Sequence, residues 1–177
     1  MFYFCLDPFS GLLGNSMPID TESFRDVLRS WASGVTVVTT RAGDKMHGMT
    51  VSAFTSVSLD PPLVLVCASQ SSTTHGVIQE GGLFTVNILA AHQADISSVF
   101  ASSKNEDSRL ESVSWSVGET GAPLIDEALV CLECRVTSAH QEGSHTIYVG
   151  QVEAVHTTDA EPLMYYQGAY RALHNEG

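Results

Sequence analysis

A series of short segments rich in β-branched and apolar residues, each bounded by turn residues, constrains the fold of this chain most strongly. The segment 35–40 reads VTVVTT, and the turn-forming stretch 41–45 separates it from a second strand-like segment at 47–54. β-branched residues favour pleated sheets, whereas Gly, Asp and Pro end strands. These two segments therefore predict a hairpin. Further strands are expected at 63–68, 84–89, 129–139 and 145–156, so we predict a mainly β fold with flanking helices.

The first flanking helix is expected just before this hairpin. Asp20 or Thr21 can cap its start, and Gly34 is expected to end it. Four apolar residues recur at helical spacing, and we expect them to pack this helix against the rest of the protein. These residues are Phe24, Val27, Leu28 and Trp31.

Two further helices are expected later in the chain. A short helix at 76–80 stops at Gly81-Gly82, and a longer helix at 91–102 points Ile96, Val99 and Phe100 inward. The segment 104–112 is predicted to be a charged loop.

The chain has 177 residues and a mass of 19.0 kDa, which suits one domain with a sizeable core. Residues 1–16 are apolar but lack the basic start of a signal peptide and are too short to span a bilayer. We expect 1–16 to be a disordered leader before a more natural start at Met17, and 17–177 to form the single domain. Since nothing indicates export, the protein is predicted to be cytoplasmic.

The chain is strongly acidic. Twenty Asp and Glu against eight Lys and Arg give a formal net charge of −12 at pH 7. Such a surface repels phosphate backbones and anionic lipids, so neither nucleic acid nor membrane is an expected partner. Phosphates on a ligand would have to be held by backbone N–H groups, hydroxyls and a helix N-terminus.

The segment 47–62, HGMTVSAFTSVSLDPP, places small hydroxyl residues between two strand-like runs. Its hydroxyls offer hydrogen bonds, while Gly48 and Ala53 leave the backbone open to close approach. This combination suits a flavin ring, which needs hydrogen bonds along its edge and apolar contact on its faces. An ordinary half-exposed strand shows the same alternation, and the segment alone leaves both interpretations open.

A second run of hydroxyl residues, 69–75, follows the strand expected at 63–68. Ser72 is a natural cap for the short helix, with Thr74 at its second position. Hydroxyls, free N–H groups and the positive end of the helix dipole together suit a phosphate. A plain capped helix is the alternative.

The four cysteines, Cys5, Cys67, Cys131 and Cys134, are expected to be reduced thiols. The last two have the CxxC spacing of a redox or zinc pair. On a strand, however, residues three apart point to opposite faces, so we expect Cys134 inside and Cys131 outside beside Glu133. No second pair completes a metal shell, and no metal site is predicted.

Several motifs, in this order, together resemble the flavin reductase-like family. They are GVTVVTT at 34–40, GMTVSAFTSVS at 48–58, DPP at 60–62, Ser72-x-Thr74, FTVNIL at 84–89, Phe100-Ala101, GSH at 143–145 and GAY at 168–170. The chain is most similar to the short-chain reductase components of two-component flavin-dependent monooxygenases, of the type found in actinobacterial aromatic catabolism and antibiotic biosynthesis. This resemblance, over about residues 20–171, implies a split β-barrel with a Greek-key sheet, and a homodimer that completes the flavin sites.

The resemblance also implies the site. Residues 50–53 would contact the isoalloxazine and ribityl chain, 56–58 the polar edge of the ring, and the hydroxyls at 69–74 the phosphates, while 100–102 would close that end. Tyr170 lies in the C-terminal motif, His145 would orient the nicotinamide, and Lys104 could add a phosphate contact. The implied flavin-binding residues are Thr50, Val51, Ser52, Ala53, Ser56, Val57, Ser58, Ser69, Ser72, Thr74, Phe100, Ala101, Ser102 and Tyr170.

The implied activity is an NAD(P)H:flavin oxidoreductase that passes hydride from nicotinamide C4 to flavin N5 and releases reduced flavin to a partner monooxygenase. The two rings must stack with these atoms about 3–3.5 Å apart. No GxGxxG motif and no arginine cluster are present, so we expect NADH rather than NADPH, bound in the flavin cleft. FAD and FMN both remain open.

Two alternatives remain, a non-catalytic flavin-binding protein and a pyridoxamine-phosphate-oxidase-like FMN oxidase. The scarcity of arginine argues against the oxidase. The remaining histidines show no metal-ligand spacing and are assigned no role; they are His47, His75, His92, His140, His156 and His174.

Overall fold

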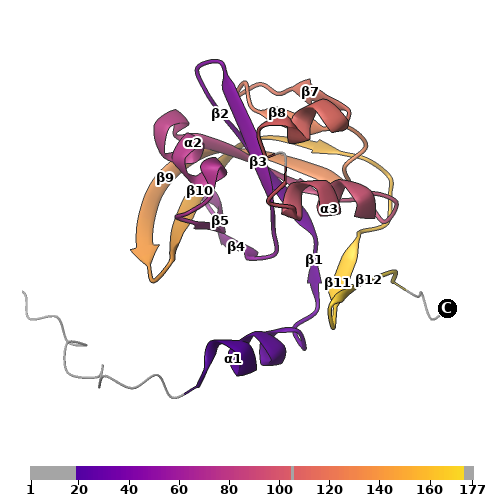
Figure 1. Ribbon diagram of the computed structural model, residues 1–177. Helices are drawn as coiled ribbons and strands as arrows, with labels where there is room; N and C mark the ends of the chain where they lie inside the picture. Colours follow the sequence, from indigo (N-terminus) through magenta and orange to yellow (C-terminus); the bar gives the residue numbers. More distant parts are fainter. Residues whose placement is uncertain (1–18, 105, 174–177) are drawn as a thin grey trace, which may run out of the picture.

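Antiparallel strands dominate the computed structural model, which describes residues 19–104 and 106–173 (Figure 1). The helices are α1 (Thr21–Leu28), α2 (Thr73–Gly81), α3 (Ala94–Ala101) and a 3₁₀ helix, η1 (Glu106–Ser112). The strands are β1 (Ser33–Gly34), β2 (Thr36–Ala42), β3 (Lys45–Val51), β4 (Phe54–Leu59), β5 (Pro62–Ser69), β6 (Leu83–Ile88), β7 (Trp115–Val117), β8 (Pro123–Ile125), β9 (Val130–Glu142), β10 (His145–Thr157), β11 (Met164–Tyr166) and β12 (Ala169–Arg171). The predicted mainly β fold is confirmed, while the predicted leader at 1–16 lies outside the described residues.

Seven strands form one sheet in the order β3-β2-β6-β9-β10-β5-β4. Its two edge strands, β3 and β4, follow one another in the chain and are separated only by Ser52 and Ala53. Three consecutive Cα–Cα steps span at most about 11 Å, so the sheet must roll until its edges approach one another. The result is a barrel that is open beside this two-residue corner. The predicted hairpin at 35–54 is present, although the returning strand stops at Val51 because of the corner.

Helices and small sheets cover the outside of the rolled sheet, so several strands are buried on both faces. On β2, Val38 belongs to one core cluster and Val37 to another. The same holds on β9, where Cys134 and Cys131 lie in different clusters. The two cysteines therefore point to opposite faces as predicted, but the prediction that Cys131 is exposed is wrong, because a layer formed by α3 and β8 covers its face.

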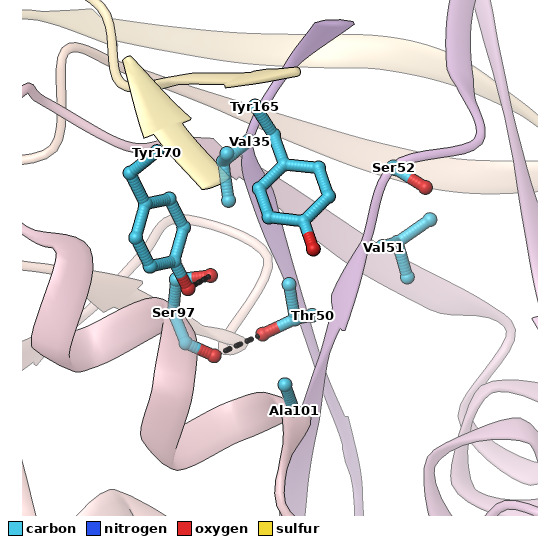
Figure 2. A pocket seen from close by; sticks show the side chains of 8 residues that line it. All are labelled: Val35, Thr50, Val51, Ser52, Ser97, Ala101, Tyr165 and Tyr170. Atoms are coloured by element: carbon cyan, nitrogen blue, oxygen red, sulfur yellow. Dashed lines mark hydrogen bonds between the residues drawn. The ribbon is translucent and has the colours of Figure 1, made fainter. Parts of the chain in front are cut away.

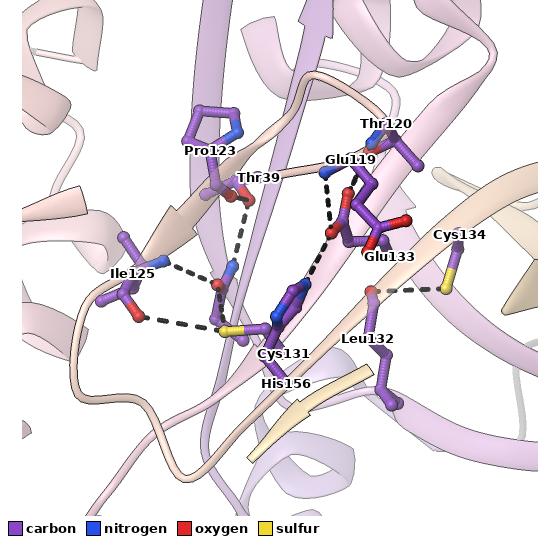
Figure 3. Close-up of polar contacts among 11 residues, drawn as sticks. Thr39, Glu119, Thr120, Pro123, Ile125, Cys131, Leu132, Glu133, Cys134 and His156 are labelled. Carbon is purple, nitrogen blue, oxygen red and sulfur yellow. Dashed lines mark hydrogen bonds and ion pairs between the residues drawn. The ribbon is translucent and has the colours of Figure 1, made fainter. Parts of the chain in front are cut away.

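Glu133, also predicted to be exposed, is fully buried and ties β9 to the loop before β8 (Figure 3). Its carboxylate accepts hydrogen bonds from the backbone N–H groups of Glu119 and Thr120 at 3.0 and 2.7 Å. It also accepts one from the Thr120 hydroxyl, and lies 2.8 Å from Nε2 of His156. Burial acts to raise the pKa of Glu133, but these hydrogen bonds outweigh it and hold the pKa below its usual range. The carboxylate is therefore an ionised structural anchor.

The first helix differs from the prediction. Asp20 caps it, its Oδ1 accepting from the backbone of Ser23 at 2.9 Å, but α1 ends at Leu28 rather than at Gly34. The backbone carbonyl of Arg29 accepts a hydrogen bond from Gln167 instead of continuing the helix. The expected packing is absent among residues 19–104 and 106–173, since no residue of α1 is buried there. Figure 1 shows α1 standing apart from the sheet.

The other helices largely match the sequence. Ser72 caps α2 as predicted, its hydroxyl accepting from the backbone N–H of His75, and Gly82 ends it in a left-handed conformation. Phe100 is buried on α3, which is shorter than expected. The predicted charged loop at 104–112 instead contains η1. Within the described residues, no helix has the length and apolar character needed to cross a bilayer.

Candidate functional site

A cavity of about 280 Å³ lies where the end of β3 faces α3 and the small sheet of β1, β11 and β12 (Figure 2). We call it the β3–α3 cavity. It adjoins the corner at which the barrel is open, and it combines a few hydroxyls with aliphatic and aromatic surface. Its lining residues are Val35, Thr50, Val51, Ser52, Ser97, Ala101, Tyr165 and Tyr170.

The cavity wall at β3 is held by contacts to α3. The hydroxyl of Thr50 donates to the backbone carbonyl of Ser97 at 2.7 Å. One turn along α3, the Phe100 ring packs so closely on Gly48 that a Cβ there would lie 2.8 Å from it. The space at Gly48, which the sequence suggested would admit a ligand, is therefore filled by Phe100. A glycine in β3 is needed for α3 to approach the strand.

Two tyrosines close the opposite side. Tyr165 on β11 and Tyr170 on β12 are cross-strand partners, with ring centroids 5.6 Å apart and the rings edge to face. The Tyr170 hydroxyl donates to Oγ of Ser97 at 3.0 Å and lies 3.3 Å from Oγ of Ser98. Tyr170 is thus placed in the cavity with its hydroxyl engaged by α3.

Other predicted residues gather at a second place, the start of α2. Ser69 is the cross-strand partner of His145, which is exposed at the first position of β10. The Ser72 hydroxyl donates to the carbonyl of Ser69 at 2.8 Å. This group is joined to the barrel corner, because the carbonyl of Ala53 accepts a hydrogen bond from the backbone of Cys67 at 3.1 Å. The Ser69 hydroxyl and the positive end of α2 are therefore linked to the corner through β5, whereas the hydroxyl of Ser72 is already engaged by Ser69 and His75.

The remaining predicted residues do not line the β3–α3 cavity. Ser56, Val57 and Ser58 lie on the edge strand β4, and Phe100 is buried in the core with 1% of its surface exposed. Of the segment 100–102, only Ala101 lines the cavity. The sequence could not show which of these residues line the cavity, because that depends on where β4 and α3 lie relative to the rest of the rolled sheet.

Thr74 is occupied by a contact that the sequence did not reveal. Its fully buried hydroxyl lies 2.7 Å from Nδ1 of His47, a histidine to which no role was assigned. Burial and the nearby charge of Arg109 lower the pKa of His47. The Thr74 hydroxyl is therefore unavailable to a phosphate, and only its backbone N–H in the first turn of α2 remains a candidate donor.

Arg109 is a further residue that the sequence analysis missed. Its guanidinium is buried, donates to the carbonyl of Gly48 at 2.9 Å and to that of Ser102, and lies 3.4 Å from Oε1 of Glu106. It therefore ties β3 to the turn after α3. No sequence signal reveals this role, because a charged residue within an acidic segment is typical of an exposed surface.

A groove beside α1 continues the β3–α3 cavity. We call it the α1 groove; its volume is about 580 Å³, and it shares Ser52 and Tyr165 with the cavity. Its lining residues are Arg25, Leu28, Arg29, Trp31, Ser33, Ser52, Ala53 and Tyr165. Sites for small molecules are concave and mostly apolar, with a few convergent polar groups and volumes of roughly 300–1,000 Å³. Cavity and groove together meet these requirements, and the residues present fit a flavin ring. Among the described residues, no cluster of His, Cys, Asp and Glu is suited to hold a metal.

Known proteins share much of this sequence and fold. Residues 28–174 match the model of the flavin reductase like domain. An NADH-dependent flavin reductase of Rhodococcus sp is 45% identical over 152 residues, which cover 84% of each chain. HsaB of Mycobacterium tuberculosis, the reductase subunit of a flavin-dependent monooxygenase, is 35% identical over 164 residues, covering 91% of this chain and 87% of HsaB.

A solved structure extends the comparison to the fold. The Streptomyces globisporus C-1027 NADH:FAD oxidoreductase SgcE6, in complex with NAD and FAD fragments, is 34% identical with a TM-score of 0.83. The match covers 89% of this chain and 94% of SgcE6. The family and the split-barrel class implied by the sequence motifs are confirmed by these matches. The chain belongs to the flavin reductase-like family.

Proposed function

We propose that this protein transfers hydride from NADH to N5 of a flavin and releases the reduced flavin to a partner monooxygenase. The observation that carries the proposal is the β3–α3 cavity, in which uncharged hydroxyls, backbone and aromatic rings meet at the open corner of the barrel. Family membership supports the reaction, since the matched relatives are named as NADH-dependent flavin reductases and as reductase subunits of monooxygenases.

The two substrates supply and accept the hydride, so the tasks of the protein are to stack their rings and to exclude water. Ser52 and Ala53 would present hydroxyl and backbone groups to the polar edge of the flavin ring, where negative charge grows during reduction. The Ser69 hydroxyl and the backbone N–H groups in the first turn of α2, which Ser72 caps, would meet the phosphates, with Lys104 as an added contact.

The roles proposed for the β4 residues and for His145 are inferred from where these residues lie relative to the barrel corner and to Ser69. Ser56, Val57 and Ser58 on β4 would approach the flavin only along the outside of the corner. His145 is exposed across from Ser69, and its Nδ1 lies 3.0 Å from the Ser144 hydroxyl. It would orient the nicotinamide above the flavin.

A single steady-state assay tests the reductase. Purified protein is mixed with NADH and either FAD or FMN, and the absorbance of the nicotinamide band is followed. We expect NADH oxidation that depends on added flavin, with slower oxidation of NADPH. A non-catalytic binder would bind flavin without oxidising NADH. An FMN oxidase would act on pyridoxamine phosphate without NADH, and either result would overturn the proposal.

The same assay ranks the two flavins, since the KM for FAD and for FMN is measured under identical conditions. Transfer to the partner is tested separately by adding a two-component monooxygenase that lacks its reductase. Product formation should require NADH, flavin and this protein together.

We also propose a homodimer. Four apolar residues of α1 and the turn after it, Phe24, Val27, Leu28 and Trp31, are 52 to 77% exposed. Two of them, Leu28 and Trp31, line the α1 groove that continues the site. A second copy would bury this face.

Light scattering should give twice the 19.0 kDa mass of the chain. The Trp31→Asp variant should shift the population toward a monomer, and a monomeric wild type would contradict the dimer.

We propose that the protein is cytoplasmic and binds neither nucleic acid nor anionic membrane; its thiols and its net charge support this proposal. Cys67, Cys131 and Cys134 are free, and burial raises the pKa of Cys131 to about 11 and that of Cys134 to about 12, so both stay protonated. Free thiols suit the cytoplasm. The net charge of −12 disfavours binding to nucleic acid and anionic lipid.

A further inference from the structure

Tyr165 occupies a singular position in the site. Of the residues that line the β3–α3 cavity, only Tyr165 and Ser52 also line the α1 groove. A ligand that fills the cavity and extends into the groove would therefore run alongside these two residues. Tyr165 was not among the predicted site residues.

The backbone holds Tyr165 in place from both sides. On β11 it is the register partner of Ser33 on β1 and of Tyr170 on β12. Its ring packs edge to face against Tyr170, whose hydroxyl is bound to Ser97. The ring is thus supported from behind by a second ring that α3 holds in place, as a preorganised binding surface requires.

The two tyrosine hydroxyls differ. That of Tyr170 is engaged by α3, whereas that of Tyr165 forms no hydrogen bond with any residue in the described part of the chain. Figure 2 shows the Tyr165 hydroxyl pointing into the space beside Thr50 and Val51. With 38% of its surface exposed, Tyr165 offers a free donor and an apolar ring face at the mouth of the cavity.

We propose that Tyr165 is a flavin-binding residue, whose ring packs on the isoalloxazine and whose hydroxyl hydrogen-bonds its polar edge, while Tyr170 acts as its support. The assignment rests on the proposed function. Because both contacts exist only in the complex, they contribute to ligand affinity and not to the stability of the free protein.

The test measures flavin affinity directly, by the change in flavin fluorescence when protein is titrated into FAD or FMN without NADH. Tyr165→Phe keeps the ring and should raise the Kd about three- to tenfold, the cost of one lost hydrogen bond. Tyr165→Ala removes the ring as well and should raise the Kd by a further factor of about ten. The melting temperature of Tyr165→Phe should equal that of the wild type.

The neighbouring Tyr166 supplies a matched control, because adjacent strand residues point to opposite faces and Tyr166 does not line the cavity. Tyr166→Phe should leave the Kd unchanged. An unchanged Kd in both Tyr165 variants would overturn the assignment while leaving the reductase proposal intact. Failure of the wild type to bind flavin would instead overturn the proposed function, and the assignment with it.

Discussion

The hydroxyl of Thr50 donates a hydrogen bond at 2.7 Å to the backbone carbonyl of Ser97 (Figure 2). This bond joins the end of β3 to the middle of α3 at the wall of the β3–α3 cavity. Both residues line the cavity, and Ser97 in turn accepts a hydrogen bond from Tyr170. These hydrogen bonds connect β3, α3 and β12 at Ser97. The shape of the site depends on them as much as on the residues that face the ligand.

Replacing Thr50 by Val tests this connection, because valine has nearly the same shape but no hydroxyl. We expect a loss of about 0.5–1.5 kcal/mol in the free energy of unfolding, and weaker flavin binding because the wall at β3 loosens. Urea unfolding and flavin titration measure the two effects. Thr55→Val, on the exposed edge strand β4, is the control and should change neither quantity. Identical behaviour of the two variants would show that the hydrogen bond does not shape the site.

Gly48 is expected to tolerate no side chain. A Cβ at this position would lie 2.8 Å from the buried ring of Phe100 and 3.1 Å from the carbonyl of Val38. Gly48→Ala should therefore lower the free energy of unfolding by about 1–3 kcal/mol and displace α3 from β3. The measurement is urea unfolding, with flavin affinity as a second readout.

Gly76 offers a matched substitution, since a Cβ there would meet nothing within 4 Å and the residue lies within α2. Gly76→Ala should leave the stability unchanged or raise it by up to about 1 kcal/mol, because alanine favours helices. Equal destabilisation by both substitutions would contradict the steric account of Gly48.

His47 should make stability depend on pH. Its pKa in the folded protein is lowered by burial and by the charge of Arg109, against which Glu106 and Asp107 act more weakly. The unfolded chain takes up a proton near the ordinary pKa of about 6.5, while the folded protein does not. The stability contribution is therefore complete above this pH and is lost as the pH falls toward the folded pKa.

His47→Gln should remove part of the fall in unfolding free energy between about pH 7 and 5.5. Denaturant unfolding at several pH values is the measurement, and His140→Gln, at an exposed position of β9, is the control. A pH dependence as steep in His47→Gln as in the wild type would exclude His47 as its source.

Glu133 should make the stability of the protein depend on pH in a more acidic range than His47 does. Its folded pKa lies below the usual range, so its stabilisation is present above the unfolded value of about 4.3 and is lost as the pH falls through the folded value. Glu133→Gln brings an amide N–H₂ against the backbone donors of Glu119 and Thr120. It should cost about 2–4 kcal/mol at pH 7 and much less at acidic pH.

The control for Glu133 is another carboxylate of the same sheet. Glu153 pairs with Arg135 at 2.9 Å on the exposed surface, so Glu153→Gln should cost less than about 1 kcal/mol. A difference between wild type and Glu133→Gln that is independent of pH would contradict the ionised anchor.

His145 is expected to affect one substrate more than the other. Because it faces the nicotinamide side in the proposed arrangement, His145→Ala should raise the KM for NADH more than the KM for flavin, with an unchanged melting temperature. Initial rates with each substrate varied in turn provide both constants. A larger effect on the flavin constant would place His145 at the other ring.

Much of this molecule could be anticipated from local patterns. The strands at 35–40, 63–68 and 84–89, the cap at Ser72 and the opposite orientation of Cys131 and Cys134 depend on neighbours a few residues apart, and all are present. The ordered motifs were also sufficient to indicate the family. These features do not depend on the rest of the fold, because strand propensity and helix capping are set by residues close together in the sequence.

Local patterns could not predict four other features. These are the burial of Cys131, the burial of Glu133, the pairing of Tyr165 with Tyr170 and the burial of Arg109. Each depends on which segment covers which face after the sheet has rolled, a consequence of contacts between residues far apart in the chain. The alternation of apolar and polar residues along a strand indicates which residues share a face, but it does not predict that a second layer will cover the outer face. The list of hydroxyl residues was therefore readable from the chain, whereas their division between the cavity, the start of α2 and the outer edge was set by long-range packing.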